Sequence, residues 1–295
     1  MIQDADIEKI ERLIKLSETH PVLPDSFIPW ETPQGNAPFI PEESLSLQGH
    51  PLYEILGPFQ RRELGRLEMA QVMWSYAWSE GLACIIFNKR LIKLNPTSLE
   101  YRYLVKELIE EFRHQDMFAR AVKMLNVDPI KQPHWAKVLA WLHVHFMPVS
   151  AQFISVLAIE LVTDMYGRRV RRDEHVYLPL RKISELHHIE EGRHIHYTKM
   201  WLDHYLKKAN AIQRTFYSLI VLANIVFMRS LYVRLDFYRQ IGLTNPDHYA
   251  RAARQQLKKK FGTYCYDEAI PFVKSFNGFN FITRPLWRRF LKVKV

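Results

Sequence analysis

The sequence predicts an all-α protein, an antiparallel four-helix bundle with additional helices and a proline-rich, extended N-terminal arm. Three observations support this prediction. From about residue 59, long apolar stretches of helical character follow one another, and no segment keeps the alternation of a strand for long. The breaks between them are short, which favours antiparallel neighbours. Half of the 16 prolines fall within residues 21–58, which predicts the arm.

The first 58 residues are expected to form an N-terminal helix and the wrapping arm. The opening stretch "MIQDADIEKIERLIKL" is amphipathic and runs from acidic to basic, which is typical of a helix and not of a signal peptide. Proline has no backbone N–H to donate, so the segment Pro21–Pro58 cannot form one regular helix. We therefore expect it to run extended over the surface.

Residues 59–245 are expected to form the bundle, and residues 246–295 a last helix and a basic tail packed on the same domain. The predicted helices are residues 59–93, 98–125, 135–166, 176–208, 211–241 and 246–260. The breaks between them are "NPTS" at Asn95, "NVDPIKQP" at Asn126, a basic turn after Tyr166 and "LTNP" at Leu243.

Composition narrows the class of protein. With 295 residues, 48% of them hydrophobic, the chain can bury a sizeable core. Cys84 and Cys265 provide neither a disulfide framework nor a Cys-x-x-Cys metal site, so a cytoplasmic location is expected. The sequence has no glycine-rich nucleotide loop and no nucleophile elbow. The uncharged run Thr215–Met228 is too short to cross a bilayer, so no transmembrane segment is expected.

The net charge of +10 fits an acidic partner or an anionic substrate. Basic residues cluster at Arg168–Arg172, at Lys258–Lys260 and in the tail "RPLWRRFLKVKV". These clusters are dispersed and no nucleic-acid-binding motif accompanies them, so we expect no nucleic acid partner. A solvated basic face explains them equally well.

A chemical repeat marks the candidate site. The stretches "EEFRH" at Glu110–His114 and "EEGRH" at Glu190–His194 lie 80 residues apart. Each is preceded by a lone carboxylate in an apolar stretch, Glu80 in "MWSYAWSEGLACIIF" and Glu160 in "AQFISVLAIELV". Glu80 lies 31 residues before Glu111, and Glu160 lies 31 residues before Glu191. One offset therefore relates both sets.

This arrangement predicts a dinuclear metal site in the bundle core. A lone buried carboxylate is costly unless it is compensated, although a protonated glutamate or an arginine partner would also compensate it. Histidine three residues after glutamate lies on the same helix face, as in Glu111 with His114 and Glu191 with His194. Four glutamates neutralise two divalent cations and two imidazoles complete the set, which is the usual di-iron or di-manganese site of helical bundles.

The second copy adds a candidate ligand. His187 lies seven residues before His194 and points in nearly the same direction, whereas His188 lies about 120° away on the helix. A core histidine bonded to a carboxylate is the alternative for His187. The matching position in the first copy is Glu107, which we expect to be a solvated helix residue.

Residues around the candidate ligands are expected to orient them or to be structural. Glu110 and Glu190 are expected to orient the opposite histidines, and Asp164 to act likewise. His143 and His145 fit no ligand spacing and are expected to be structural.

These residues resemble the ferritin-like p-aminobenzoate N-oxygenase family, the arylamine N-oxygenases of the aureothin and chloramphenicol type. The resemblance covers Gly57–Ile241 and implies a ferritin-like bundle, usually homodimeric. It also implies two iron ions (manganese is possible), O2 as co-substrate and oxidation of an aryl amine to hydroxylamine, nitroso or nitro products. By resemblance, the ligands are three histidines and four glutamates: Glu80, Glu111, His114, Glu160, His187, Glu191 and His194.

The expected function is N-oxygenation of an (aryl)amine. Electrons must come from an external reductase or small reductant, since the sequence carries no flavin or ferredoxin motif. The "EExRH" spelling also resembles soluble acyl-carrier desaturases, which lack the extra histidine, so an acyl desaturase or C-hydroxylase acting on a carrier-bound substrate is the first alternative. A non-catalytic ferritin-like metal-binding protein is the second.

The substrate pocket is expected near two tryptophans and two core residues: Trp74, Trp78, Phe153 and Leu157. A carboxylated amine requires a basic partner, for which Arg229 and Arg234 are available. Otherwise the substrate has no free carboxylate or is tethered to an acidic carrier protein.

Overall fold

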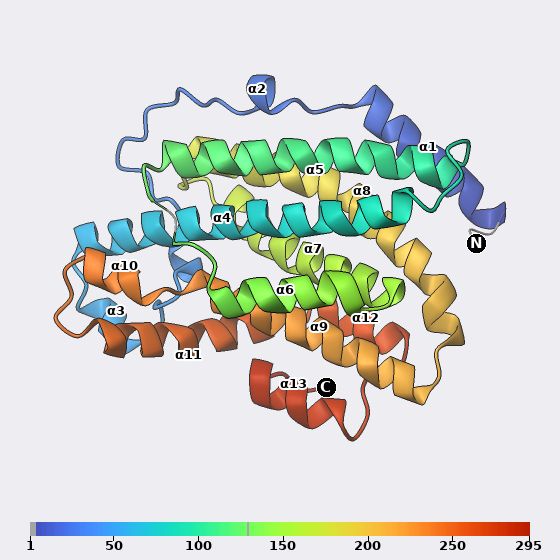
Figure 1. Cartoon of the computed structure of the whole chain (residues 1–295). Helices are drawn as coiled ribbons and strands as arrows, with labels where there is room; N and C mark the ends of the chain where they lie inside the picture. Colours follow the sequence, from blue (N-terminus) through green and yellow to red (C-terminus); the bar gives the residue numbers. More distant parts are fainter. Residues whose placement is uncertain (1–3, 129) are drawn as a thin grey trace.

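The computed structural model describes residues 4–128 and 130–295, in which the regular elements are all helices, and this confirms the all-α prediction (Figure 1). The bundle consists of two helical hairpins. In the first, α4 (Pro58–Leu91) packs on α5 (Leu99–Met124), and in the second α7 (Val149–Arg172) packs on α8 (Leu178–Lys208). The hairpins meet through α4 with α7 and α5 with α8, so the two copies of the repeat face one another.

The N-terminal segment lies along the bundle (Figure 1). Helix α1 (Asp4–Thr19) packs on α5, while residues 1–3 of the expected helix lie outside the described residues. The arm that follows is extended except for three single-turn helices, which are α2 (Pro24–Phe27), the 3₁₀ helix η1 (Glu42–Ser44) and α3 (Pro51–Glu54). Backbone contacts secure the arm to the start of α8, since Tyr177 donates its N–H to Pro38 O at 2.9 Å and its hydroxyl to Thr32 O at 2.7 Å.

The helix predicted at residues 135–166 is two helices, and the reason is a proline. Helix α6 (His134–Phe146) ends before Pro148, which is the N-cap of α7. Proline cannot donate a backbone hydrogen bond, so a continuous helix through it is disfavoured. Gln152 instead donates its side-chain amide to Val144 O at 2.8 Å and Met147 O at 3.0 Å, which satisfies carbonyls at the end of α6.

The last third also has more breaks than predicted. The segment predicted as one helix over residues 211–241 forms α9 (Ala211–Tyr232) and α10 (Leu235–Gln240), and α11 (Pro246–Tyr264) follows. The predicted tail contains α12 (Ala269–Ser275) and α13 (Thr283–Leu291). Trp287 of α13 is fully buried and donates its indole N–H to Ser218 Oγ of α9 at 3.2 Å, so this tail is anchored to the core.

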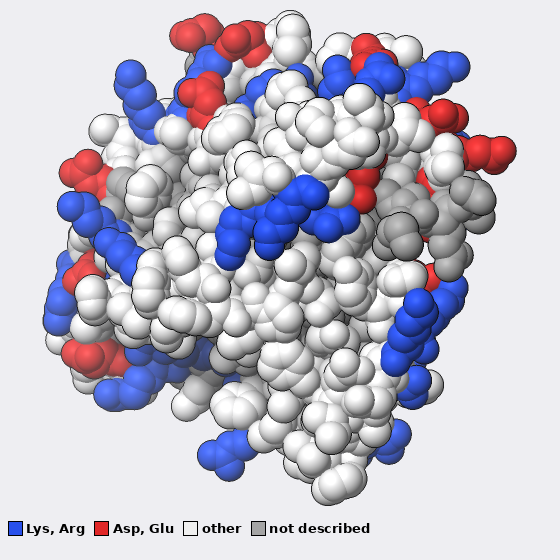
Figure 2. Space-filling model, turned by 45° about the vertical axis from the view of Figure 1, so that its right-hand side comes forward, with Lys and Arg blue, Asp and Glu red and all other residues white. Residues whose placement is uncertain are grey.

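Two helices are long and apolar enough to cross a membrane. In α7, 89% of the apolar window is buried, as expected of a central bundle helix. In the stretch formed by α9 and α10, 50% is buried. On the face of the molecule shown in Figure 2, Lys and Arg side chains form separate groups around a broad uncharged area.

Candidate metal centre

The bundle brings all seven predicted site residues into its interior. Each of the four long helices supplies at least one of them, and all are buried. They are Glu80 on α4, Glu111 and His114 on α5, Glu160 on α7, and His187, Glu191 and His194 on α8. Together with one further residue they form two groups, in each of which the ligand atoms lie within 4.8 Å of one another.

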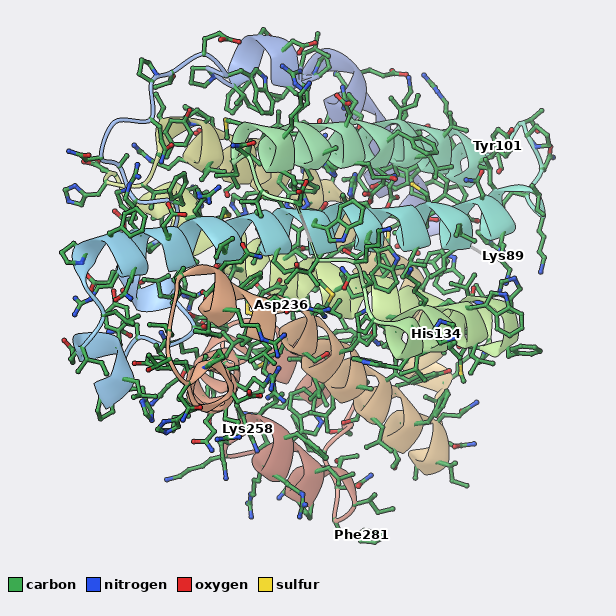
Figure 3. The ribbon with its side chains drawn as sticks, turned by 60° about the vertical axis from the view of Figure 1, so that its left-hand side comes forward. Lys89, Tyr101, His134, Asp236, Lys258 and Phe281 are labelled. Carbon is green, nitrogen blue, oxygen red and sulfur yellow. The ribbon has the colours of Figure 1, made fainter. Side chains whose placement is uncertain are left out.

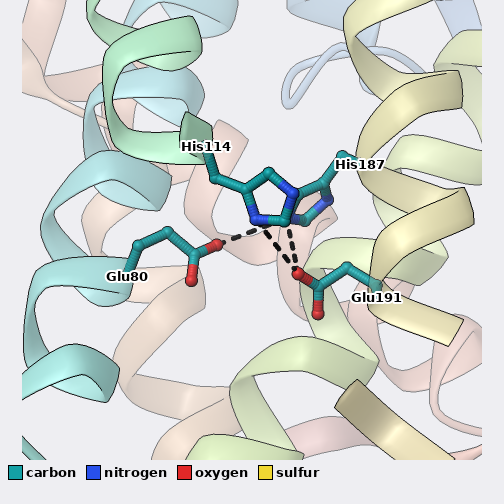
Figure 4. Close-up of side chains that lie close together, drawn as sticks. All are labelled: Glu80, His114, His187 and Glu191. Carbon is teal, nitrogen blue, oxygen red and sulfur yellow. Dashed lines mark hydrogen bonds and ion pairs between the residues drawn. The ribbon is translucent and has the colours of Figure 1, made fainter. Parts of the chain in front are cut away.

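The first group contains Glu80, His114, His187 and Glu191 (Figure 4). His187 Nε2 lies 3.3 Å from Glu80 Oε1 and 3.1 Å from Glu191 Oε1. The His187 ring stacks on Tyr76, with centroids 5.8 Å apart and planes 24° apart. This stacking holds the ring with its nitrogen toward both carboxylates, so His187 lies where the sequence predicted it.

The second group contains Glu107, Glu111, Glu160 and His194. Glu107 was expected to be solvated, and this expectation is wrong because its side chain points into the bundle and is only 1% exposed. One signal was available in the sequence, since Glu107 lies 80 residues before His187 and therefore shares the offset of the repeat.

Glu111 and Glu191 lie between the two groups. His114 Nδ1 is 3.6 Å from Glu111 Oε2 and 3.6 Å from Glu191 Oε1. His194 Nδ1 is 3.2 Å from Glu111 Oε1 and 3.5 Å from Glu191 Oε1. Each carboxylate thus faces both imidazoles, which is the position from which a glutamate bridges two metal ions.

The first glutamate of each "EExRH" copy binds the histidine of the other copy. Glu190 Oε2 lies 2.9 Å from His114 Nε2, and Glu110 Oε2 lies 2.9 Å from His194 Nε2. These contacts match the orientation predicted for Glu110 and Glu190. They turn Nδ1 of each histidine toward the central carboxylates, as outer carboxylates do for metal-binding histidines.

The arginine of each copy balances the outer carboxylates. Arg193 Nη2 lies 2.8 Å from Glu110 Oε1, and Arg113 Nη2 lies 2.9 Å from Glu190 Oε1. A buried carboxylate is costly without a charge partner, and each arginine supplies one to the outer glutamate that it contacts. Each of the four repeated residues in the "EExRH" motif therefore makes a contact at the centre or beside it.

Asp164 does not orient a histidine of the centre, contrary to expectation. Its carboxylate contacts His188 Nδ1 and lies 3.1 Å from Arg168 Nε, toward the outside of the bundle. His188 is about one-third exposed, consistent with a residue on the outer side of α8. Four residues turn an α-helix by about 400°, so Asp164 lies about 40° around the axis of α7 from the inward-facing Glu160 and points partly outward.

In the cluster, neighbouring carboxylates raise the pKa values of buried imidazoles. Burial would lower the pKa of His114, but Glu111 and Glu190 outweigh it and raise the pKa to about 10. Burial would likewise lower the pKa of His187, but Glu191 and Glu80 raise it to about 9.

The lone glutamates show the opposite effect of burial. Burial and neighbouring carboxylates raise the pKa of Glu80 and Glu160 well above the usual value. Without a cation, the centre therefore retains protons, which divalent cations would displace.

The chemistry of the donors fits two divalent cations. Both carboxylate oxygens of four glutamates and Nδ1 of two histidines are buried and have no hydrogen-bond partner in residues 4–128 and 130–295. These residues are Glu107, Glu111, Glu160, Glu191, His114 and His194. Buried polar atoms are nearly always paired, and mixed carboxylate and imidazole donors suit iron or manganese.

A cavity of about 600 Å³ reaches the centre at Glu80 and Glu160. Its walls come from α4, α6, α7 and α9, and α6, which starts at His134, covers this side of the bundle along α4 (Figure 3). Most lining side chains are apolar, among them Ala83, Leu139 and Ile159, and the polar ones include His143 and Asn224.

The four residues named for the pocket do not themselves line the cavity, although their neighbours Ser79, Ser155 and Val156 do. Phe153 and Leu157 are fully buried away from the cavity, and Phe153 stacks on Trp201 with centroids 4.1 Å apart. Trp78 packs on Phe227 at 5.9 Å and does not line the cavity. The sequence predicted correctly that α4 and α7 supply cavity walls, but it did not predict which faces of these two helices do so.

The cavity has no basic wall. Among the described residues that line it there is no Lys or Arg. Arg229 donates to Phe290 O at 2.7 Å and Arg234 to Lys131 O at 3.3 Å, so neither serves the cavity. His143, expected to be structural, does line it, and burial lowers the pKa of its imidazole, which favours the neutral form.

Comparison with known proteins agrees with this geometry. The sequence profile of the family described as p-aminobenzoate N-oxygenase AurF matches residues 3–276. An uncharacterized protein of Mycobacterium bovis and one of Mycobacterium tuberculosis are each 29% identical to the chain over 226 residues, which is 72% of this chain and 66% of each relative. The match thus spans slightly less than two-thirds of these relatives.

The family match covers nearly the whole chain and includes every helix that contributes to the centre. It confirms the resemblance seen in the sequence. The chain belongs to the p-aminobenzoate N-oxygenase AurF family, a family of oxygenases of the di-iron kind.

Proposed function

We propose that this chain is a di-iron N-oxygenase whose substrate is an apolar (aryl)amine without a free carboxylate. The observation that supports this most directly is the cavity, which is apolar along its walls and ends at Glu80 of one group and Glu160 of the other. A substrate in it would therefore lie against both metal positions. Family membership supplies the reaction class.

The proposed ligands are the seven predicted from sequence: Glu80, Glu111, His114, Glu160, His187, Glu191 and His194. Two iron ions (or manganese ions) held by them would supply the activation of O2. Glu110 and Glu190 fix the imidazoles of His194 and His114 so that Nδ1 stays directed at the centre.

The chain's own residues would bind and orient the amine. Asn224 donates its side-chain amide to Ser155 Oγ at 2.9 Å and to Ile220 O at 2.9 Å, which fixes the amide plane at the cavity wall. Its carbonyl oxygen then remains to accept a hydrogen bond from the amine N–H. The apolar walls exclude water and favour the neutral amine, whose nitrogen lone pair is the reacting group.

The first oxidation step defines what else the reaction needs. Conversion of an amine to a hydroxylamine inserts one oxygen atom of O2 into an N–H bond and reduces the other to water, which consumes two electrons and two protons. These electrons come from an external reductase or small reductant. A homodimer and a cytoplasmic location complete the proposal.

The amine reaches the cavity either free or on an acidic carrier protein, which the basic surface would accept. The two forms differ in salt dependence, because screening weakens attraction between exposed charges. We propose the free amine as the substrate, so activity should be insensitive to added salt. A loss of activity at high salt would instead indicate a docked carrier.

An acyl desaturase or C-hydroxylase is the alternative that one observation favours, since an apolar cavity also fits an acyl chain. The test uses iron-loaded protein with a chemical reductant and O2, and offers uncharged aryl amines, carboxylated aryl amines and acyl thioesters in parallel. Mass spectrometry should detect hydroxylamine, nitroso or nitro products from the uncharged amines. Desaturated or C-hydroxylated acyl products without N-oxygenation would overturn the proposal.

A further inference from the structure

The two halves of the centre correspond at a fourth position, where the sequence predicted a solvated residue in the first copy. Glu107 precedes Glu111 by four residues, as His187 precedes Glu191 by four. The structure gives Glu107 and His187 equivalent places, since each is the fourth member of its group. The repeat therefore relates four positions on each side, and only this pair differs in residue type.

Glu107 has no partner that would explain its burial. Neither of its carboxylate oxygens has a hydrogen-bond partner among residues 4–128 and 130–295. Its electrostatic neighbours are His194, two glutamates of the centre (Glu111 and Glu191) and the outer Glu110, and no Lys or Arg is among those with a main influence on it. Tyr103, one turn earlier, does not use its hydroxyl to bond Glu107. A buried carboxylate in this situation either takes up a proton or has a cation beside it, and the metal-ligand groups on either side favour the cation.

We propose that Glu107 is an eighth protein ligand, which binds the second metal position at the place that His187 takes on the first. This inference rests on the two-metal centre of the proposed function. The first position then has two imidazoles and two carboxylates, whereas the second has one imidazole and three carboxylates.

The donor difference makes the two positions chemically unequal. Oxygen-rich sites favour harder cations, while imidazole-rich sites favour the later divalent ions. Five glutamates against two divalent ions also leave one negative charge in excess, which favours a higher oxidation state at the second position. When iron and manganese compete, the second position should therefore hold the larger fraction of manganese.

The test replaces Glu107 in two ways and compares metal content. Glu107→Gln removes the charge but keeps the size, and Glu107→His creates the donor set of the first position on the second. Glu68→Gln is the control, because Glu68 is another buried glutamate, which is bonded to Ser46 and belongs to neither group of the centre. Circular dichroism verifies that each variant is folded.

Bound iron is measured after loading with Fe²⁺ and dialysis against a graded chelator. The unaltered protein, Glu107→His and Glu68→Gln should each retain two ions per chain. Glu107→Gln should lose one ion at a chelator strength at least about tenfold lower, because it lacks one direct ligand. Equal retention of both ions by Glu107→Gln would overturn the role of Glu107 while leaving the two-metal centre intact.

A second measurement needs no variant and remains informative if Glu107→Gln does not fold. Crystals of the unaltered protein loaded with equal Fe²⁺ and Mn²⁺ are measured at both absorption edges. The manganese fraction should be higher beside Glu107 than beside His187, and equal fractions would count against the inference. If the unaltered protein binds no metal at all, the proposed function fails, which is a different result from either of these.

Discussion

Replacing Glu110 by glutamine tests how the centre is organised. Glu110 Oε2 lies 2.9 Å from His194 Nε2, and Oε1 lies 2.8 Å from Arg193 Nη2. Glutamine keeps the size of the side chain but removes the negative charge that faces His194 and Arg193. Loss of such an outer carboxylate typically weakens metal binding by about 10–100-fold, or about 1.4–2.7 kcal/mol. We expect this loss at the second metal position, to which His194 belongs.

Two matched variants make the experiment specific. Glu190→Gln removes the equivalent contact to His114, at 2.9 Å, and should weaken the first position by a similar factor. Asp164→Asn alters a carboxylate that contacts His188 and Arg168 on the outer side, and should leave metal affinity unchanged.

The assay is competition with a chelator of known affinity, followed by absorbance and metal analysis. Affinities within about twofold of the unaltered protein for both Glu110→Gln and Glu190→Gln would refute the role assigned to the outer carboxylates. An equal loss in Asp164→Asn would show that the effect reflects general charge and not orientation of the histidines.

Three further predictions concern the cavity and the core. Ile159→Arg places a cation in the cavity wall. A charge-assisted hydrogen bond is worth about 1.5–3 kcal/mol, so the ratio of kcat/KM for a carboxylated aryl amine to that for its uncharged analogue should rise by about 10–100-fold. An unchanged ratio would contradict the cavity assignment. Burial raises the pKa of Glu68 to about 7, although its hydrogen bonds with Ser46 oppose this. The contribution of Glu68 to the free energy of unfolding is therefore full below about pH 4.5 and is lost as the pH rises through about 7. Chemical denaturation should show a fall of about 3 kcal/mol in the free energy of unfolding of the unaltered protein, and no such fall in Glu68→Gln. Gly262→Ala would place a Cβ 1.9 Å from Leu291 O, so the C-terminal segment must shift and the free energy of unfolding should fall by about 1–3 kcal/mol, while an unchanged Tm would contradict this close packing.

The sequence contained enough to predict the fold class and to bring seven site residues together. The reason is the repeat, since Glu80 lies 31 residues before Glu111 and Glu160 lies 31 residues before Glu191. In two helical hairpins, equal spacing along the chain places equivalent residues at the same level of the bundle. Their binding of metal remains a prediction. The same spacing paired Glu107 with His187, but Glu107 was expected to be solvated because the two residue types differ and the symmetry of the repeat breaks there.

The cavity could not be predicted in the same way. Its walls depend on which faces of α4 and α7 meet α6 and α9, and this is decided by tertiary packing and not by spacing within one helix. Treating residues 135–166 as one helix also hid α6, which becomes a separate cover for the cavity only because the chain breaks before Pro148. His143, which fits no ligand spacing, was expected to be structural, but it lines the cavity.

The most direct test is X-ray diffraction at the iron absorption edge from crystals of the iron-loaded protein. We expect two anomalous peaks per chain, with Glu111 and Glu191 between them, one beside His187 and the other beside His194. A single peak, or none at this centre, would contradict a two-metal oxygenase.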